Sequence, residues 1–241
     1  MKNKTALVTG ASRGIGRAVA VLLAKNKTRL ILTARSQENL SRTSRIIEEH
    51  NAPTPVIIPA DLSEPEQIEK LTCDIHNQFD SLDILVNNAG VTYSARLDET
   101  PTEKWDLLMN VNARAPFILI RQLLDLLEKP EQAHIINIAS VVAIKGYPEQ
   151  SAYSASKHAL RGMTIALSEE LRDTGINVRL LCPGGVDTDM VETTRPDIDK
   201  KDLIKPDEIA ELVLYLVTHK GNAVIDELRI RRKASSPWYS S

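Results

Sequence analysis

The segment YSASK, residues 153–157, places a tyrosine and a lysine four residues apart. On an α-helix this spacing puts Tyr153 and Lys157 on one face. A phenol has a pKa of about 10 and exchanges protons poorly at neutral pH, but a neighbouring ammonium group favours the phenolate and lowers that pKa. The pair is therefore a candidate acid/base for proton transfer. The same spacing also occurs on ordinary helices, so a structural role is the alternative.

The segment TGASRGIG, residues 9–16, places three glycines between an apolar run and a helix pattern. Gly10 permits a tight turn, Gly14 permits close approach to the backbone, and Gly16 lets the helix pack near the strand. The unpaired N–H groups of a helix N-terminus suit a pyrophosphate. The spacing GxxxGxG differs from the usual GxGxxG. The turn is a candidate dinucleotide site, and a plain structural turn is the alternative.

Two arginines surround the place where an NAD site usually carries an acidic residue. The second apolar run ends LTARS, with Ala34 where the acid is expected and Arg35 after it. An acidic residue would accept a hydrogen bond from the ribose 2′-hydroxyl, whereas Arg35 and Arg13 would bind a 2′-phosphate. The sequence therefore favours NADP over NAD. The alternative is that both are solvated surface arginines.

Short runs rich in Val, Ile and Leu alternate with longer amphipathic segments. Such runs are typical of strands that are buried on both faces of a sheet. The alternation predicts a single α/β domain over residues 1–241, with a doubly wound parallel sheet of about seven strands and helices on both faces. The expected strands are 5–9, 29–34, 55–60, 82–88, 134–140, 177–182 and 224–231, and the expected helices are 16–26, 36–50, 63–79, two within 101–128, 151–173 and one from Pro206.

Charge and composition exclude several classes of function. Lys and Arg number 30 and Asp and Glu number 32, a net charge of −2 that argues against general affinity for nucleic acid or anionic membranes. No apolar stretch approaches the roughly 18 residues of a membrane span, and the N-terminus leaves no room for a signal peptide. We expect a cytoplasmic protein. Cys73 and Cys182 form neither a disulfide framework nor a metal cluster, and Cys182 is expected in a buried strand.

Six motifs occur in order and at suitable separations, and together they resemble the short-chain dehydrogenase/reductase family from the first strand to about residue 190. The resemblance implies a Rossmann-type fold and hydride transfer between a nicotinamide cofactor and a carbonyl carbon. The motifs are TGASRGIG (9–16), NNAG (87–90), VNA (111–113), IAS (138–140), YSASK (153–157) and PGGVDT (183–188).

The resemblance implies four catalytic residues. Tyr153 matches the catalytic acid/base, and Lys157 matches the residue that lowers its pKa and holds the nicotinamide ribose. Ser140 matches the serine that hydrogen-bonds the substrate carbonyl, so Ser140 and Tyr153 would also bind substrate. Asn112 matches the asparagine that holds a water for a proton relay. Taken singly, Ser140 could cap a strand end and Asn112 could cap a helix.

The resemblance also implies a set of residues around one NADP molecule. Asp61 matches the acid that contacts the adenine amino group. The full cofactor set is Gly10, Ser12, Arg13, Gly14, Ile15, Gly16, Arg35, Asp61, Leu62, Asn88, Ala89, Gly90, Tyr153, Lys157, Pro183, Gly184, Val186 and Thr188.

The substrate region is less well defined by the sequence. Residues 190–205 are expected to form a substrate loop or a short mobile helix, short enough for an open or modest pocket. The run RIRRK, residues 229–233, is interpreted as a solvated strand end, with an acidic partner as the alternative. Residues 233–241 are expected as a C-terminal tail in which Trp238 and Tyr239 could dock on a neighbouring subunit. Candidates for the pocket lining are Tyr93, Ser94, Val142 and Tyr147.

These observations predict an NADPH-dependent carbonyl reductase that assembles as a homodimer or homotetramer. Its substrate would be a 3-oxoacyl thioester, or else a small ketone, diketone or pterin-like carbonyl. The C-terminus lacks the G…GG segment common in 3-oxoacyl-[acyl carrier protein] reductases, which weakens the thioester assignment. A non-catalytic NADP-binding regulator is the alternative, although such a protein need not keep all four catalytic residues.

Overall fold

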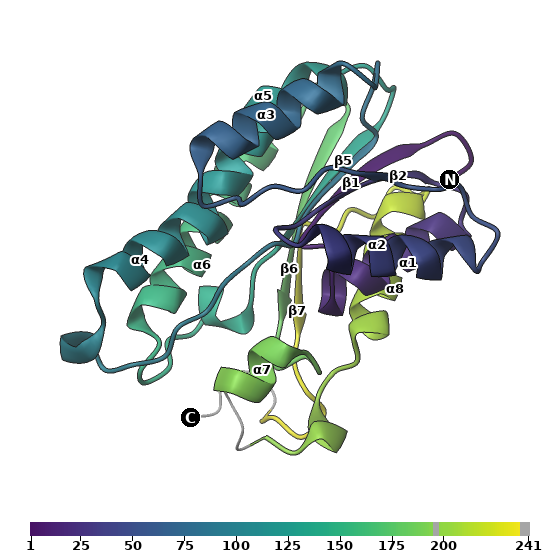
Figure 1. The fold of residues 1–241 in the computed structure, drawn as a ribbon. Coiled ribbons are helices and arrows are strands. Elements are labelled where there is room, and N and C mark those ends of the chain that lie inside the picture. Colours follow the sequence, from purple (N-terminus) through teal and green to yellow (C-terminus); the bar gives the residue numbers. More distant parts are fainter. Residues whose placement is uncertain (195–197, 237–241) are drawn as a thin grey trace.

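A computed structural model describes residues 1–194 and 198–236. Seven parallel strands form one sheet in the order β3-β2-β1-β4-β5-β6-β7, which confirms the predicted doubly wound fold (Figure 1). The strand order reverses between β1 and β4, the place where open α/β sheets bind ligands. The strands are β1 Thr5–Thr9, β2 Arg29–Thr33, β3 Val56–Ile57, β4 Ile84–Asn87, β5 Ala133–Ile138, β6 Ile176–Pro183 and β7 Glu227–Ile230.

Helices cover both faces of the sheet (Figure 1). One face carries α1 Gly14–Lys25, α2 Gln37–Glu48 and α8 Pro206–Thr218. The other carries α3 Pro65–His76, α4 Thr102–Met109, α5 Ala115–Leu127 and α6 Ser151–Glu170, while the short α7, Asp189–Thr194, lies beyond the carboxyl ends of the strands. No helix of the described residues is long and apolar enough to cross a bilayer.

Strand β1 shows why the strand runs are almost continuously apolar. All five of its residues are buried. Ala6 and Val8 pack into the core beneath α1 and α8, whereas Leu7 packs into the core beneath α3 and α5. Because successive side chains of a strand point to opposite faces, a strand between two helical layers needs apolar residues at every position.

The starts of two helices differ in how well the sequence predicts them. Ser36 opens the helix expected over 36–50 and is a residue type that favours N-caps; it caps α2, since its hydroxyl accepts a hydrogen bond from Asn39 N at 3.2 Å. Ser63 opens the helix expected over 63–79 in the same way but does not cap it, because α3 begins at Pro65 after Glu64. The Ser63 hydroxyl instead donates to the Asp61 carboxylate at 2.8 Å, because a carboxylate two residues away competes with the backbone for it.

Residues 102–127 form two helices joined without a loop. Between α4 and α5 the chain makes a π-helical turn, Asn110–Arg114, at the VNA motif. Pro116 follows in the first turn of α5. Proline has no N–H to donate to the carbonyl four residues earlier, so the α-helical bond to the Asn112 carbonyl is missing. Such π-turns are common at functional sites.

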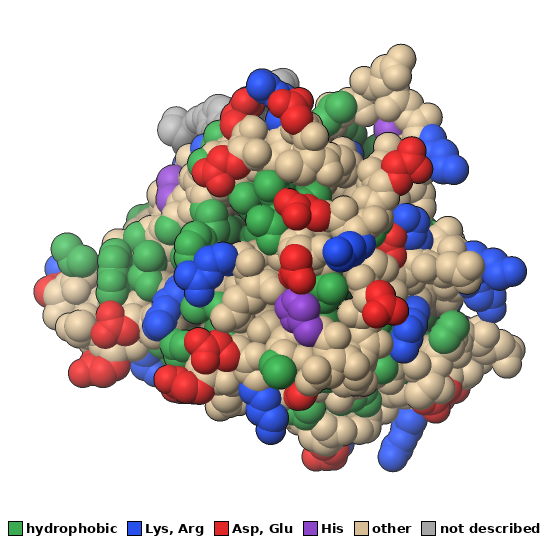
Figure 2. All heavy atoms as spheres, turned by 90° about the horizontal axis from the view of Figure 1, so that it is seen from above, with side chains coloured by type: hydrophobic (Ala, Val, Ile, Leu, Met, Phe, Trp, Pro, Cys, Tyr) green, Lys and Arg blue, Asp and Glu red, His purple; other side chains and the backbone are tan. Residues whose placement is uncertain are grey.

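Acidic and basic side chains are interspersed on the face of the molecule opposite α7 (Figure 2). The view shows no broad area of a single sign, in keeping with the nearly balanced composition. Among the described residues, no group of three His, Cys, Asp or Glu side chains could hold a metal ion.

A half-buried histidine on β5, His134, makes stability depend on pH. The Nη1 of Arg179 lies 2.8 Å from Nδ1 of His134, and burial, with the charges of Arg179 and Lys4, lowers the pKa of His134 from 6.5 to about 4. Between about pH 6.5 and pH 4, His134 is therefore mostly protonated in the unfolded chain but mostly neutral in the folded protein. We expect the free energy of unfolding to fall by about 2 kcal/mol between pH 7 and pH 5 on this account.

Urea unfolding of wild type and His134→Gln at both pH values measures this contribution. The variant should lose about 2 kcal/mol less on acidification, because its amide does not titrate. His76→Gln is the control, since the backbone of Thr72 and the side chain of Asp125 raise the pKa of His76. Its protonation stabilises the fold as pH falls, so this variant should lose at least as much as wild type. An identical pH dependence in His134→Gln and wild type would disprove the assignment.

Candidate active site

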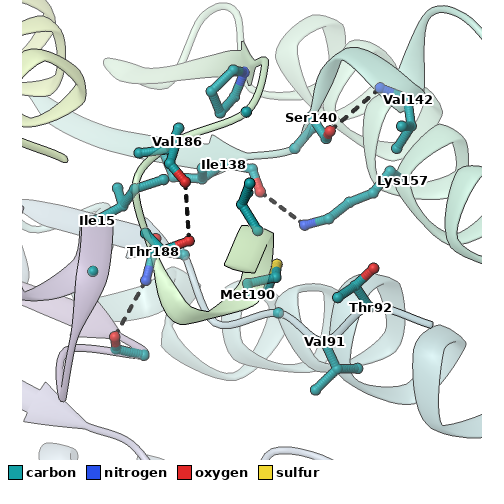
Figure 3. Close-up of a pocket in the computed structure, with 18 of the residues that line it drawn as sticks. Ile15, Val91, Thr92, Ile138, Ser140, Val142, Lys157, Val186, Thr188 and Met190 are labelled. Atoms are coloured by element: carbon teal, nitrogen blue, oxygen red, sulfur yellow. Dashed lines mark hydrogen bonds between the residues drawn. The ribbon is translucent and has the colours of Figure 1, made fainter. Parts of the chain in front are cut away.

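A pocket of about 1250 Å³ opens at the carboxyl ends of the central strands, beside α7 (Figure 3). It extends from the glycine turn after β1 to Ser140 after β5 and to Tyr153 on α6. Segments that are far apart in sequence thus meet where the strand order reverses, as expected for an open parallel sheet.

The glycine turn is shaped by contacts that a side chain would block. Gly10 and Gly14 have φ of +64° and +53°, a region that favours glycine. A Cβ on Gly10 would lie 2.8 Å from Asn88 Nδ2, and one on Gly16 would collide with the carbonyl of Gly10. Asn88 Nδ2 donates to Thr9 O at 2.9 Å. The end of β4 therefore holds the turn in place, and the start of α1 faces the pocket with an open backbone cradle suited to a pyrophosphate.

The two arginines predicted to bind a 2′-phosphate both line the pocket but have different partners. The Arg13 Nη1 donates to Asp189 Oδ2 at 2.6 Å, an exposed ion pair between the glycine turn and α7. Arg35 is exposed and has no hydrogen bond or ion pair within the described residues. Of the two guanidinium groups, the one on Arg35 is therefore open to a phosphate in this structure.

Asp61, which the resemblance assigns to the adenine, lines the pocket. Its carboxylate accepts from Ser63 N at 3.0 Å and from Ser63 Oγ at 2.8 Å, and its backbone N–H donates to Gln67 Oε1 at 2.8 Å. Leu62 beside it is buried. These bonds fix the position of the Asp61 side chain at the pocket wall.

Tyr153 and Lys157 lie in the first turns of α6, and both are buried. Burial raises the pKa of Tyr153 to about 12, against an opposing hydrogen bond with Ser140. Burial lowers the pKa of Lys157 to about 8, and its Nζ donates to Ile138 O at 3.1 Å (Figure 3). The predicted lowering of the Tyr153 pKa is therefore wrong, because burial of the phenol dominates. At neutral pH the phenol keeps its proton, as an acid must.

Ser140 follows β5 and begins a short 3₁₀ helix, Val141–Ala143. Its Oγ accepts a hydrogen bond from Val142 N at 3.3 Å (Figure 3). The capping role that the sequence left open as an alternative is thus real, and the same hydroxyl is also the hydrogen-bond partner of Tyr153. Because the cap orients Ser140, both hydroxyls can converge on one oxygen atom in the pocket.

Asn112 does not line the pocket. It is fully buried, with Oδ1 accepting from Val91 N at 2.9 Å and Nδ2 donating to Val91 O at 2.9 Å and to Ser156 Oγ at 3.0 Å. Ser156 Oγ in turn donates to Tyr153 O at 2.8 Å. The amide of Asn112 is therefore occupied in tying the segment after β4 to α6.

The structure brings together nearly the whole predicted set. Among the predicted cofactor and catalytic residues, Gly16 and Asn112 alone do not line the pocket, since both pack beneath it. Val142 and Tyr147 line the pocket as predicted, whereas Tyr93 and Ser94 do not. Tyr93 instead packs against the cluster around Leu108.

Two regions near the C-terminus contribute to the pocket wall. The expected substrate loop, residues 190–205, contains most of α7 and a 3₁₀ turn, Lys200–Asp202, and contributes Met190, Val191 and Ile198 to the pocket. The run RIRRK ends β7, and Arg229, Arg231 and Lys233 are exposed as predicted. Beyond that prediction, Arg229, Arg231 and Arg232 line the pocket, as do residues 234–236 of the expected tail. Trp238 and Tyr239 lie outside the described residues. The sequence also missed Lys145 and Gln150, which no motif marks.

The sequence is similar to those of known oxidoreductases. Residues 4–199 match the family model for short chain dehydrogenases. An uncharacterized oxidoreductase of Staphylococcus epidermidis is 32% identical over 96% of this chain and 98% of its own length.

Solved structures of oxidoreductases are also similar to this chain. A metagenomic short-chain oxidoreductase in complex with NADP is 32% identical, with a TM-score of 0.84 over 97% of this chain and 99% of its own. A variant of actinorhodin polyketide ketoreductase with NADPH is 30% identical, with a TM-score of 0.87 over 96% of this chain and 97% of its own. The chain belongs to the short-chain dehydrogenase/reductase family of oxidoreductases.

Proposed function

We propose that the protein is an NADPH-dependent oxidoreductase that reduces a carbonyl to an alcohol, with Tyr153 as the proton donor. The observation that carries this proposal is the placement of Tyr153, buried beside Ser140 in a pocket that continues to the glycine turn. Burial raises the pKa of this phenol to about 12. A phenol that keeps its proton at neutral pH is suited to protonate an alkoxide as it forms.

The pocket residues fit NADP. The backbone cradle at Gly10 and Gly14 would receive the pyrophosphate, Asp61 would contact the adenine, and Arg35 would bind the 2′-phosphate. The solved relatives named above contain NADP or NADPH, which supports the same choice. When bound, the reduced nicotinamide supplies the hydride.

The chain's own residues would then handle the charge and the proton. Ser140 would donate a hydrogen bond to the substrate oxygen, which stabilises the negative charge that develops there. Tyr153 would transfer its proton to that oxygen. Lys157, with a pKa of about 8, is mainly cationic at pH 7 and would stabilise the phenolate left behind. The Asn112 carbonyl, released from α-helical bonding by Pro116, would hold the water through which the proton is replaced.

Consumption of NADPH, with NADH in parallel, tests the proposal against a panel of carbonyl compounds that includes an acetoacetyl thioester and a simple diketone. We expect turnover of at least one compound, with kcat/KM at least tenfold higher for NADPH than for NADH. The polyketide ketoreductase relative supports a ketone group as the target, and the panel distinguishes a thioester from a small ketone or pterin-like carbonyl. Tight NADPH binding without any turnover would instead support the non-catalytic regulator.

We also propose that the protein assembles as a homodimer or homotetramer. Large apolar side chains are exposed on the helices that cover one face of the sheet: Trp105 on α4, Phe117 on α5 and Ile165 on α6. Exposed apolar side chains on neighbouring helices are typical of subunit interfaces. Light scattering on the purified protein measures the assembly directly, and a mass of 26.7 kDa, that of one chain, would contradict the proposal.

A further inference from the structure

The segment that follows β7 forms part of the pocket wall next to the PGG motif. Gly184 N donates to Ile230 O at 2.7 Å. A Cβ on Gly185 would lie 3.4 Å from Cδ and 3.7 Å from Nε of Arg232. The side chain of Arg232 therefore lies along the glycines after β6, and it lines the same pocket as Ser140 and Tyr153.

The charges that line the pocket are strongly unbalanced. Its two acidic residues are both occupied, because Asp189 pairs with Arg13 and Asp61 accepts two hydrogen bonds from Ser63. The basic lining residues outside the proposed 2′-phosphate corner are Lys145, Lys157, Arg229, Arg231 and Arg232. Among the described lining residues, cations thus outnumber carboxylates, and such an excess of positive charge favours an anionic ligand.

Arg232 is the arginine of this group that is open to a ligand. Arg229 Nε donates to Glu227 Oε1 at 2.6 Å. Arg231 Nη1 donates to the carbonyls of residues 232, 233 and 235, which holds the segment in its fold. Arg232 is half-buried, and its side chain has no hydrogen bond or ion pair within the described part of the chain. A planar guanidinium without an acceptor in a pocket matches a carboxylate or phosphate, which can accept two parallel hydrogen bonds.

We propose, on the basis of the reductase function above, that the carbonyl substrate carries an oxyanion group, a carboxylate or a phosphate, and that Arg232 binds it. Lys145 is a further cation of the pocket wall; its Nζ lies 5.8 Å from the centre of the Tyr147 ring, which also lines the pocket. Substrate choice would then depend on a residue beyond β7 as well as on the loop after β6.

Matched pairs of substrates test the proposal. For the carboxylate, the pair is 4-oxopentanoate and its methyl ester; for the phosphate, it is dihydroxyacetone phosphate and dihydroxyacetone. In wild type we expect kcat/KM for one anion to exceed that of its neutral partner at least tenfold. In Arg232→Gln this ratio should fall at least tenfold, through KM, while the KM for NADPH stays within twofold. Arg232→Lys should restore part of the ratio, because it keeps the charge without the planar fork.

Arg172→Gln is the matched control, since Arg172 is exposed beyond the end of α6 and outside the pocket. It should keep the wild-type ratio. Equal kcat/KM for anion and neutral partner in wild type would overturn the proposal, and a raised KM for NADPH in Arg232→Gln would assign Arg232 to the cofactor.

A binding measurement separates this proposal from the reductase function. If no panel compound is turned over, the reductase proposal fails, but the anion site is still tested by the melting temperature with NADP present. The anion of a pair should then raise the Tm of wild type more than its neutral partner does, and Arg232→Gln should lose this difference. No difference in wild type would exclude an oxyanion site.

Discussion

Replacing Tyr153 with Phe should lower kcat for carbonyl reduction about a thousandfold, because the proton donor is removed while the packing of the ring is kept. The Kd for NADPH should change little, since the phenol hydroxyl contributes less to cofactor binding than the glycine turn and Arg35. Stopped assays at high enzyme concentration give kcat, and quenching of protein fluorescence by NADPH gives the Kd.

Tyr147→Phe is the matched control for this experiment. Tyr147 also lines the pocket but is exposed, outside the Ser140–Tyr153 pair. The same loss of one hydroxyl there should change kcat by less than threefold. Near-normal turnover in Tyr153→Phe would refute the assigned role, and equal losses in the two variants would point to a general effect on the pocket.

Replacing Arg35 with Asp should reverse the cofactor preference. The change removes the guanidinium that would pair with the 2′-phosphate and places a carboxylate where it repels that phosphate and accepts a hydrogen bond from a 2′-hydroxyl. We expect the ratio of kcat/KM for NADPH over NADH to fall at least a hundredfold. Steady-state kinetics with both cofactors on one carbonyl substrate measure the ratio.

Arg172→Asp provides the same charge change far from the pocket and should leave the ratio within twofold. If Arg35→Asp weakens both cofactors equally, Arg35 does not bind the 2′-phosphate. Arg13, on the opposite side of that corner, would then be the next arginine to test, once its ion pair with Asp189 is removed as well.

Much of the fold follows from local patterns in the sequence, because a strand covered on both faces must be apolar at each position and a parallel sheet requires helical crossovers. The motif residues also assemble as the resemblance implies. The pKa of Tyr153 could not be obtained in this way. Helical spacing places Lys157 on the same face, but the sign of the shift depends on burial, which the whole fold sets.

The other features that the sequence did not predict depend mainly on contacts between segments that are distant in the chain. The Arg13–Asp189 ion pair joins residues that are 176 positions apart. The run RIRRK is the exposed strand end that its charges predict, but nothing local shows that the chain after β7 returns across Gly184 and Gly185. A run of charges has the same appearance in sequence whether it faces bulk water or a pocket. The helical spacing of apolar residues does not predict the π-turn at Asn112 either, although Pro116 shows that a helical hydrogen bond must be missing there.

The central position of β1 has a consequence for the chain during its synthesis. Strand β1 pairs with β2 on one side, but its other neighbour is β4, whose paired residues come about 78 positions later. A nascent chain therefore leaves one edge of an apolar strand open until β4 emerges from the ribosome, and such edges are prone to association. The glycine turn also lacks its packing partner Asn88 until then. A motif of consecutive residues thus depends on a contact with a residue 78 positions later in the chain.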